Sequence, residues 1–223
     1  MAPTIINFPE VAGWTSVQFD PIVPRDVDRM EGRRTEAQTF GTPWWKASYG
    51  APWLSERDFG IMDAFMMQAG DGGEVFRAYD VFRMRPIAWT EARGNVPLSG
   101  IRAGGAGAFD GTATLSSITN RRQILVTGLP AEFQFRAGDY VEVVKSASLI
   151  SLHRIMEDVK AGLAGTVSLK IKYGLDTTIF AGAAKVNFEK PSCLMQIDPG
   201  SYSGPKAWSS RNPSFSAQEV FFS

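Results

Sequence analysis

One stretch of the sequence, residues 42–80, constrains the fold more than any other, because its periodicity changes twice. Large and small residues alternate over 44–54, as is typical of a strand in a pleated sheet. Ser55 is a residue type typical of a helix N-cap, and the spacing of the apolar residues after it predicts a helix over 56–69. A glycine-rich turn leads to a second predicted strand over 74–79. The stretch therefore predicts one helix packed on a sheet.

The apolar residues of the predicted helix recur every three or four positions, which places them on one face. These residues are Phe59, Met62, Phe65, Met66 and Ala69. We expect this face to be the one that contacts the sheet.

The middle of the chain carries short segments in which apolar and polar residues alternate. Strands are predicted over 113–118, 123–127, 140–144 and 166–172, with turn residues between them. The segment 148–159 fits the spacing of a helix as well as that of a strand. Short strands at regular spacing indicate a small antiparallel barrel or sandwich.

The last part of the chain, 215–222, predicts an apolar strand, which would be a liability as a free edge. Its pairing with the first domain would bring both ends of the chain into one domain. The composition becomes glycine-rich from Gly94, which marks a domain boundary. We therefore predict a mainly β, α+β fold with one principal helix. A β-sandwich body is expected from 1–93 and 181–223, with a small antiparallel β-barrel or sandwich module, 94–180, inserted between them.

The composition argues against several classes of function. Lys and Arg number 23, as do Asp and Glu, so the chain lacks the net positive charge that nonspecific nucleic-acid binding uses. One cysteine, Cys193, and one histidine, His153, exclude a disulfide framework, a thiolate zinc site and a multi-histidine metal site. The sequence contains no recognisable catalytic motif. We therefore predict no catalytic residue, no metal and no cofactor, and do not expect an enzyme.

The sequence also gives an expectation about location. No apolar run approaches the roughly 20 residues of a membrane span. The N-terminus lacks the basic start and apolar core of a signal peptide. We expect no membrane partner, and a protein that is used without export or leaves the cell in a larger assembly.

Three segments are candidates for contact with other subunits. The proline- and aromatic-rich arm, 1–24, serves either as an edge strand of its own domain or as an arm on a neighbouring subunit. The segment 25–39 interleaves acidic and basic residues, which indicates a solvated loop or a segment that pairs with its like on another subunit. The terminal strand is the third. The candidate interface residues are Phe8, Trp14, Phe19, Arg33, Arg34, Glu36, Phe215, Val220, Phe221 and Phe222.

The order of several features resembles that in the distal-tail or minor-tail proteins of the tail tip of tailed bacteriophages. The features are an aromatic arm, a tryptophan strand, a helix with a phenylalanine near its end, a Glu-x-Phe strand, a glycine-rich stretch and a Gly-Asp strand. In this sequence they lie at 1–24, 44–49, 56–69, 74–76, 104–111 and 135–141. The resemblance covers roughly residues 40–223, and the chain departs from it at 173–175, where the family has Pro-Leu.

The resemblance implies a β-sandwich subunit of a ring, usually of six copies, that joins the tail tube to the tip hub and carries fibres. The partners would be other copies of the chain, the tail tube protein, and hub and fibre proteins. The location would be the tail tip of the virion, after synthesis in the cytoplasm of a bacterial host. The family has no catalytic residues to transfer to this sequence.

Two other functions stay open at this point. A carbohydrate-binding module would use a flat platform of exposed tryptophans, for which Trp53, Trp89 and Trp208 are candidates. A hydrolase would need a cleft with two carboxylates roughly 5–10 Å apart and a raised pKa on one of them.

Overall fold

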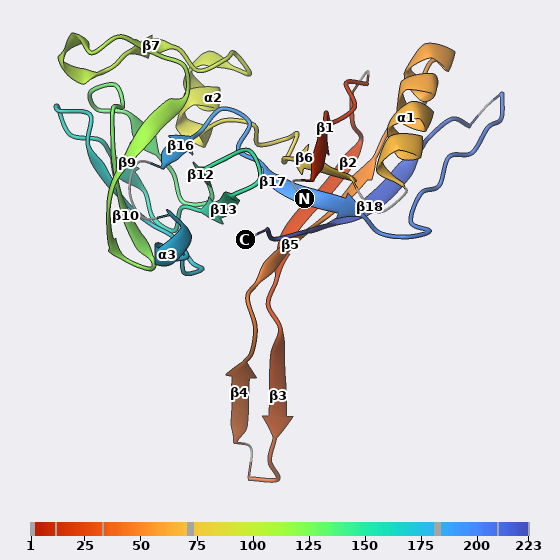
Figure 1. Cartoon of the computed structure of the whole chain (residues 1–223), viewed down its shortest axis with the longest axis horizontal. Helices are drawn as coiled ribbons and strands as arrows, with labels where there is room; N and C mark the ends of the chain where they lie inside the picture. The colour runs from red at the N-terminus through yellow and green to blue at the C-terminus, as the bar shows by residue number, and fades with distance from the viewer. Residues whose placement is uncertain are drawn as a thin grey trace. The chain divides into compact units, whose positions relative to one another are not determined.

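The computed structural model describes residues 3–11, 13–32, 34–70, 74–180, 184–208 and 210–222. These residues form several β-sheets, one of them curled into a half-barrel, and three α-helices (Figure 1). The longest helix is α1 (Glu56–Ala69), which has the predicted bounds. The predicted mainly β, α+β class with one principal helix is confirmed.

The chain forms two compact units. The flanking unit consists of Thr4–Phe76 and Met195–Val220. The inserted unit consists of Arg77–Leu194, to which the described chain ends at Pro3 and 221–222 also belong. The insertion therefore begins and ends outside the predicted range of 94–180.

The insertion starts before Gly94 because the segment that precedes this glycine bonds within the inserted unit. The backbone N of Ile87 donates to Asp139 at 2.8 Å, and Arg85 donates from Nε to Glu189 at 2.9 Å. Helix α2 (Ile87–Arg93), which the sequence analysis did not predict, lies in this segment. These bonds hold residues 77–93 to the module that follows them.

The flanking unit is built on a six-stranded mixed sheet with the strand order β1-β6-β17-β18-β5-β2. The pair β1–β6 is parallel, and the pairs β17–β18, β18–β5 and β5–β2 are antiparallel. In this order the strands are β1 (Thr4–Ile6), β6 (Glu74–Ala78), β17 (Cys193–Ile197), β18 (Ser214–Glu219), β5 (Trp44–Gly50) and β2 (Ser16–Ile22).

Both edges of this sheet come from the N-terminal segment, since β1 forms one edge and β2 the other. β2 pairs with β5 along its whole length, from Ser16 opposite Gly50 to Ile22 opposite Trp44. Of the two alternatives for the arm 1–24, the edge strand of its own domain is therefore the one observed.

Helix α1 covers one face of the sheet. Ser55 caps it, accepting from the backbone N of Asp58 at 3.2 Å, and the five residues predicted to face the sheet are all buried. The ring of Phe65 lies 5.2 Å from Phe76 of β6 and 5.8 Å from Phe215 of β18. The layer opposite this sheet face is thus a helix, where the predicted sandwich expected a second sheet.

β2 and β5 lead into a second two-stranded ladder, the hairpin of β3 (Arg25–Arg29) and β4 (Thr35–Thr39). The backbone N of Phe40 donates to the carbonyl of Pro24 at 3.0 Å and links the two ladders. Every residue of both hairpin strands is exposed. Figure 1 shows the hairpin continuing beyond the ends of β2 and β5.

The inserted unit is built on an antiparallel six-stranded sheet with the order β13-β12-β16-β9-β10-β15. The outermost strands come together at a single bridge between Ile155 and Ile171, so the sheet curls toward closure. In order the strands are β13 (Ile150–Arg154), β12 (Tyr140–Val144), β16 (Lys185–Asn187), β9 (Thr112–Asn120), β10 (Gln123–Thr127) and β15 (Val167–Lys170).

Smaller elements complete the inserted unit. They are the ladders β7 (Gly100–Ile101) with β8 (Ala108–Phe109) and β11 (Gln134–Phe135) with β14 (Val159–Lys160), the 3-10 turn η1 (Ala103–Gly105) and helix α3 (Thr177–Phe180). The ambiguous segment 148–159 forms strand β13 and not a helix. The apolar core includes Phe109, Phe133, Phe135 and Phe188.

Candidate assembly interface

Three of the predicted interface residues lie in the core of the flanking unit. Phe8, Phe19 and Phe215 are 9%, 3% and 2% exposed. Phe8 contacts the ring of Tyr49 at 4.9 Å, and Phe19 stacks on Trp45 at 5.3 Å. Their predicted place at a subunit interface is corrected, because the aromatic arm and β18 bury these rings within their own unit.

Four others are less buried. Trp14 is half-buried and lies 5.3 Å from the rings of both Phe8 and Tyr49, so it covers the aromatic core. Val220 and Phe222 are half-buried, and Phe221 is 57% exposed. The terminal strand β18 ends at Glu219, so these three residues follow the strand and are not part of it.

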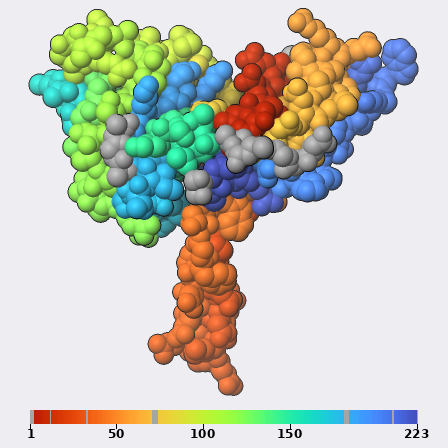
Figure 2. Space-filling view, in the orientation of Figure 1, coloured from red at the N-terminus to blue at the C-terminus, as the bar shows by residue number. Residues whose placement is uncertain are grey.

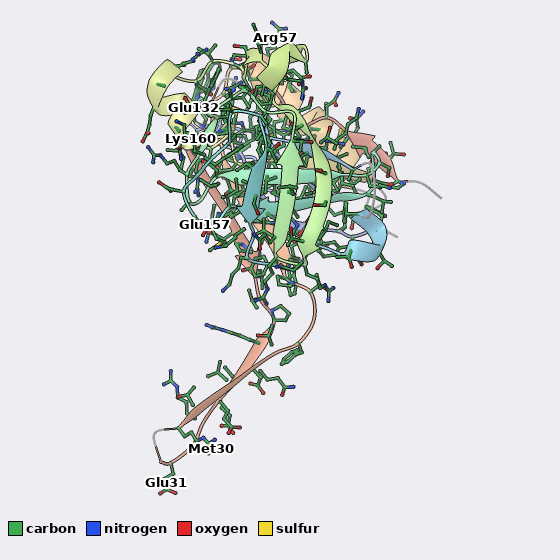
Figure 3. The ribbon with its side chains drawn as sticks, turned by 90° about the vertical axis from the view of Figure 1, so that its left-hand side faces the viewer. Met30, Glu31, Arg57, Glu132, Glu157 and Lys160 are labelled. Atoms are coloured by element: carbon green, nitrogen blue, oxygen red, sulfur yellow. The ribbon has the colours of Figure 1, made fainter. Side chains whose placement is uncertain are left out.

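The remaining candidates belong to the hairpin. Arg34 and Glu36 form an ion pair at 3.7 Å with both side chains well exposed. Arg33 lies outside the described residues. Met30 and Glu31 lie at the tip, and the side chains of the two strands point to both sides of the ribbon (Figure 3). Of the predicted interface segments, the hairpin is therefore the one exposed along its whole length.

The register of the hairpin sorts its side chains onto two faces. Asp26 lies opposite Gln38 and Asp28 opposite Glu36, so these four share one face. The other face carries the alternate pairs. These are Arg25 with Thr39, Val27 with Ala37, and Arg29 with Thr35. We call the first the acidic face and the second the basic face.

Apolar side chains are also exposed along the hairpin and at its base. Val27 is 41%, Met30 45% and Phe40 56% exposed. Figure 2 shows the hairpin, in orange, standing clear of the sheet of its own unit on the sides in view. Such a ribbon lacks the third strand or packed layer that usually gives a hairpin stability in water.

A buried polar network, which the sequence did not predict, lies on the face of β12 opposite the core residues Val141 and Val143. The side chain of Glu142 is fully buried and accepts from Arg77 at 3.0 Å, Asn187 at 2.7 Å and Ser192 at 3.2 Å. Burial raises the pKa of Glu142, and these donors oppose that rise. The donors fix the chain on either side of the insertion, so this carboxylate has a structural role.

A second network lies beside it on the same unit. Tyr140 donates from its hydroxyl to Asp80 at 3.2 Å and accepts from Arg154 at 2.8 Å. Arg83 also pairs with Asp80 at 3.2 Å. Burial, together with the nearby charge of Asp80, raises the pKa of Tyr140 to about 12. The tyrosine is therefore neutral at physiological pH and holds two opposite charges together.

His153 is buried on β13, where it lies opposite Val141 of the core. Its Nε2 lies 2.8 Å from the hydroxyl of Ser151, and Nδ1 has no partner among the described residues. Burial lowers the pKa of His153 to about 4. The ring is therefore neutral at pH 7, as expected of a packing residue.

The tryptophans proposed as a sugar platform differ in exposure. Trp89 is half-buried, bonded through Nε1 to the carbonyl of Val96 and covered by Arg93 at 4.3 Å from its ring. Trp53 is 53% exposed, with Arg211 over its ring at 5.8 Å, and Trp208 is 97% exposed. Only Trp208 of these three is almost fully open to solvent.

Among the described residues, no group of three or more His, Cys, Asp or Glu side chains is placed to hold a metal ion. No helix in the described parts of the chain combines the length and apolar character needed to cross a membrane.

No protein-family model matches this chain, and a search of curated proteins finds no match either.

Proposed function

We propose that the protein is a structural subunit of a bacteriophage tail tip, which assembles into a ring of six copies between the tail tube and the tip hub. In this proposal the ring also anchors fibres or other tip proteins. The order of sequence features suggested this family. The observation that carries the proposal is the hairpin β3–β4, whose strands are exposed along their whole length.

The hairpin supports assembly for a physical reason. Five residues per strand extend it by about 17 Å, and an isolated two-stranded ribbon is marginal in water. Val27 and Met30 place apolar surface on it that the flanking unit does not cover. Contact with another chain would bury this surface and give the ribbon its missing layer.

The edge strand β2 supports the same proposal. It is seven residues long and ends the sheet on one side. Pro21 removes one donor from it, but its other edge groups could pair with a neighbouring chain. In a closed ring, each subunit would offer different surfaces to its two neighbours.

Removal of the hairpin tests the proposal, and the β2–β5 ladder defines where the chain can be rejoined. Ile22 lies opposite Trp44, so residues 23–43 can be replaced by Asn-Gly, which forms a tight two-residue turn between paired strands. We expect this variant to keep its circular dichroism spectrum and to be monomeric, while the wild-type protein forms rings by native mass spectrometry and electron microscopy. A wild-type protein that stays monomeric at every concentration, alone and with a tube protein, would contradict the proposal.

The alternative is a carbohydrate-binding module, and the exposure of Trp208 is the observation that favours it. Against it, Arg211 lies over the ring of Trp53, the other exposed candidate. A glycan array probed with the wild-type protein and with Trp208→Ala tests it. Binding that Trp208→Ala abolishes would establish this alternative.

A further inference from the structure

The two faces of the hairpin carry opposite charge. On the acidic face Asp26, Asp28 and Glu36 contribute −3 and Arg34, which pairs with Glu36, contributes +1, so the described sum is −2. On the basic face Arg25 and Arg29 contribute +2. These charges, which leave out Glu31 in the turn at the tip, are equal and opposite on the two faces.

The acidic face does not balance its charge within the hairpin. Asp28 lies directly opposite Glu36, and like charges at such a position destabilise a ladder. The one ion pair on this face, between Arg34 and Glu36, is exposed at both ends. Exposed pairs of this kind contribute little. The repulsion between these carboxylates thus destabilises the free hairpin, and a positively charged partner would relieve it.

The basic face has the complementary form. Between its two arginines lie Val27 and Ala37, which are small apolar residues in direct cross-strand contact. Val27 is 41% exposed. Small side chains at the centre, with a guanidinium at either end, allow another ribbon to approach closely and to be held by charge.

We propose that the acidic face of the hairpin docks on the basic face of the hairpin of a second copy of this chain. The partner is another copy because a single ribbon carries both halves of the charge match. The contact joins unlike faces, so each copy uses one face toward each neighbour. Such a contact generates a ring when the rotation between copies closes, and an open filament when it does not. This interface rests on the proposed ring function and assigns the residues that give its subunits their order.

Two charge-reversal variants test the interface. Asp26→Lys with Asp28→Lys makes both faces basic, and Arg25→Glu with Arg29→Glu makes both faces acidic. All four positions are exposed, so neither variant loses a buried contact in its own chain. We expect each variant alone to be monomeric where the wild-type protein is assembled, with the assembly midpoint raised at least tenfold in concentration.

Mixing the two variants in equal amounts is the decisive measurement. Every contact between unlike variants then joins an acidic face to a basic face, so we expect rings with alternating subunits, seen as mixed-mass species by native mass spectrometry. The matched control is Glu10→Lys with Glu91→Lys, which makes the same change in net charge at exposed positions outside the hairpin. This control should assemble as the wild-type protein does.

The outcomes separate the interface from the ring itself. If the wild-type protein assembles and both variants assemble equally well, or if the mixture stays monomeric, the hairpin interface is wrong and the ring stands. If the wild-type protein forms no assembly, alone or with a tube protein, both are overturned.

Discussion

Arg77 donates from Nη1 to Oε1 of Glu142 at 3.0 Å, and the carboxylate it reaches has no exposed surface. Ser192 donates to the same carboxylate from the other end of the insertion. The buried carboxylate of Glu142 thus binds the incoming and the outgoing segments of the inserted unit to strand β12. Substitution of these two residues therefore tests how much the pair stabilises the inserted unit.

Replacement of Arg77 by Met should leave the buried carboxylate of Glu142 without its positively charged donor. We expect a loss of about 2 kcal/mol in the free energy of unfolding, less than for a fully enclosed pair because Arg77 is 39% exposed. The double variant Arg77→Met/Glu142→Met should recover most of this loss. Urea unfolding measures both, and a double variant as unstable as the sum of two single losses would refute the assignment.

His153 should make the inserted unit sensitive to acid. Between its ordinary pKa of 6.5 and about 4, the unfolded chain binds a proton that the folded protein does not. Stability from this group is therefore present above pH 6.5 and falls by about 3 kcal/mol as the pH drops through this window. His153→Gln, which keeps a polar partner for Ser151, should flatten the dependence. Hydrogen exchange of β12 and β13 from pH 4 to 7 provides the measurement.

Glu219 should give the flanking unit the opposite behaviour. Its carboxylate accepts from the backbone N of Trp45 at 2.9 Å, yet burial raises its pKa from 4.5 to about 8. The folded protein therefore holds a proton that the unfolded chain releases, so stability is lost as the pH rises from 4.5 to 8. Glu219→Gln should be more stable than the wild-type protein by about 5 kcal/mol at pH 9 and nearly equal to it at pH 4. Exchange rates in β18 that respond to pH identically in both proteins would exclude this role.

Phe8 should be needed for folding, since its ring is 9% exposed and lies against Tyr49. Phe8→Ala should lower the free energy of unfolding by about 3–5 kcal/mol. Phe40→Ala, at a 56% exposed position of the same unit, is the matched control and should change it by less than about 0.5 kcal/mol. Equal losses in calorimetry would mean that the arm does not pack as described.

Gly165 lies where the backbone of another segment comes too close for a side chain. Its φ is +67°, and a Cβ at this position would lie 2.1 Å from the carbonyl oxygen of Leu129. Gly105 has a φ of +73° with open space around it. Gly165→Ala should therefore be less stable than Gly105→Ala by at least about 2 kcal/mol, because both share the backbone strain and only one has the clash. Thermal unfolding of the two variants compares them directly.

Local patterns predicted the elements whose determinants are close in sequence. The Ser55 cap and the spacing of apolar residues fixed helix α1 at both ends. Alternation placed the strands from 113 to 172 near their observed positions. Helix α2 was missed because Pro86, a residue without a capping side chain, precedes it and none of its residues is fully buried.

Features that depend on distant segments could not be predicted. The alternation along β12 predicted a strand but not the burial of Glu142, which bonds to Arg77 and Ser192 from segments distant in sequence. The arm 1–24 gave no local sign of which sheet its strands would join. The segment 25–39 was predicted to be charged and solvated, but not to form a hairpin. The two faces of the hairpin follow from the pairing of Asp28 with Glu36, which needs the register.

The strand order of the flanking sheet has a consequence for synthesis on the ribosome. β17 and β18 lie between β6 and β5, yet they are translated only after the whole of the inserted unit. The N-terminal strands therefore leave the ribosome without the centre of their sheet, whereas Arg77–Leu194 is complete earlier. The usual order of vectorial folding, with the N-terminal part first, is reversed. Until β17 and β18 emerge, β5 and β6 of each nascent chain expose edges that the finished sheet conceals.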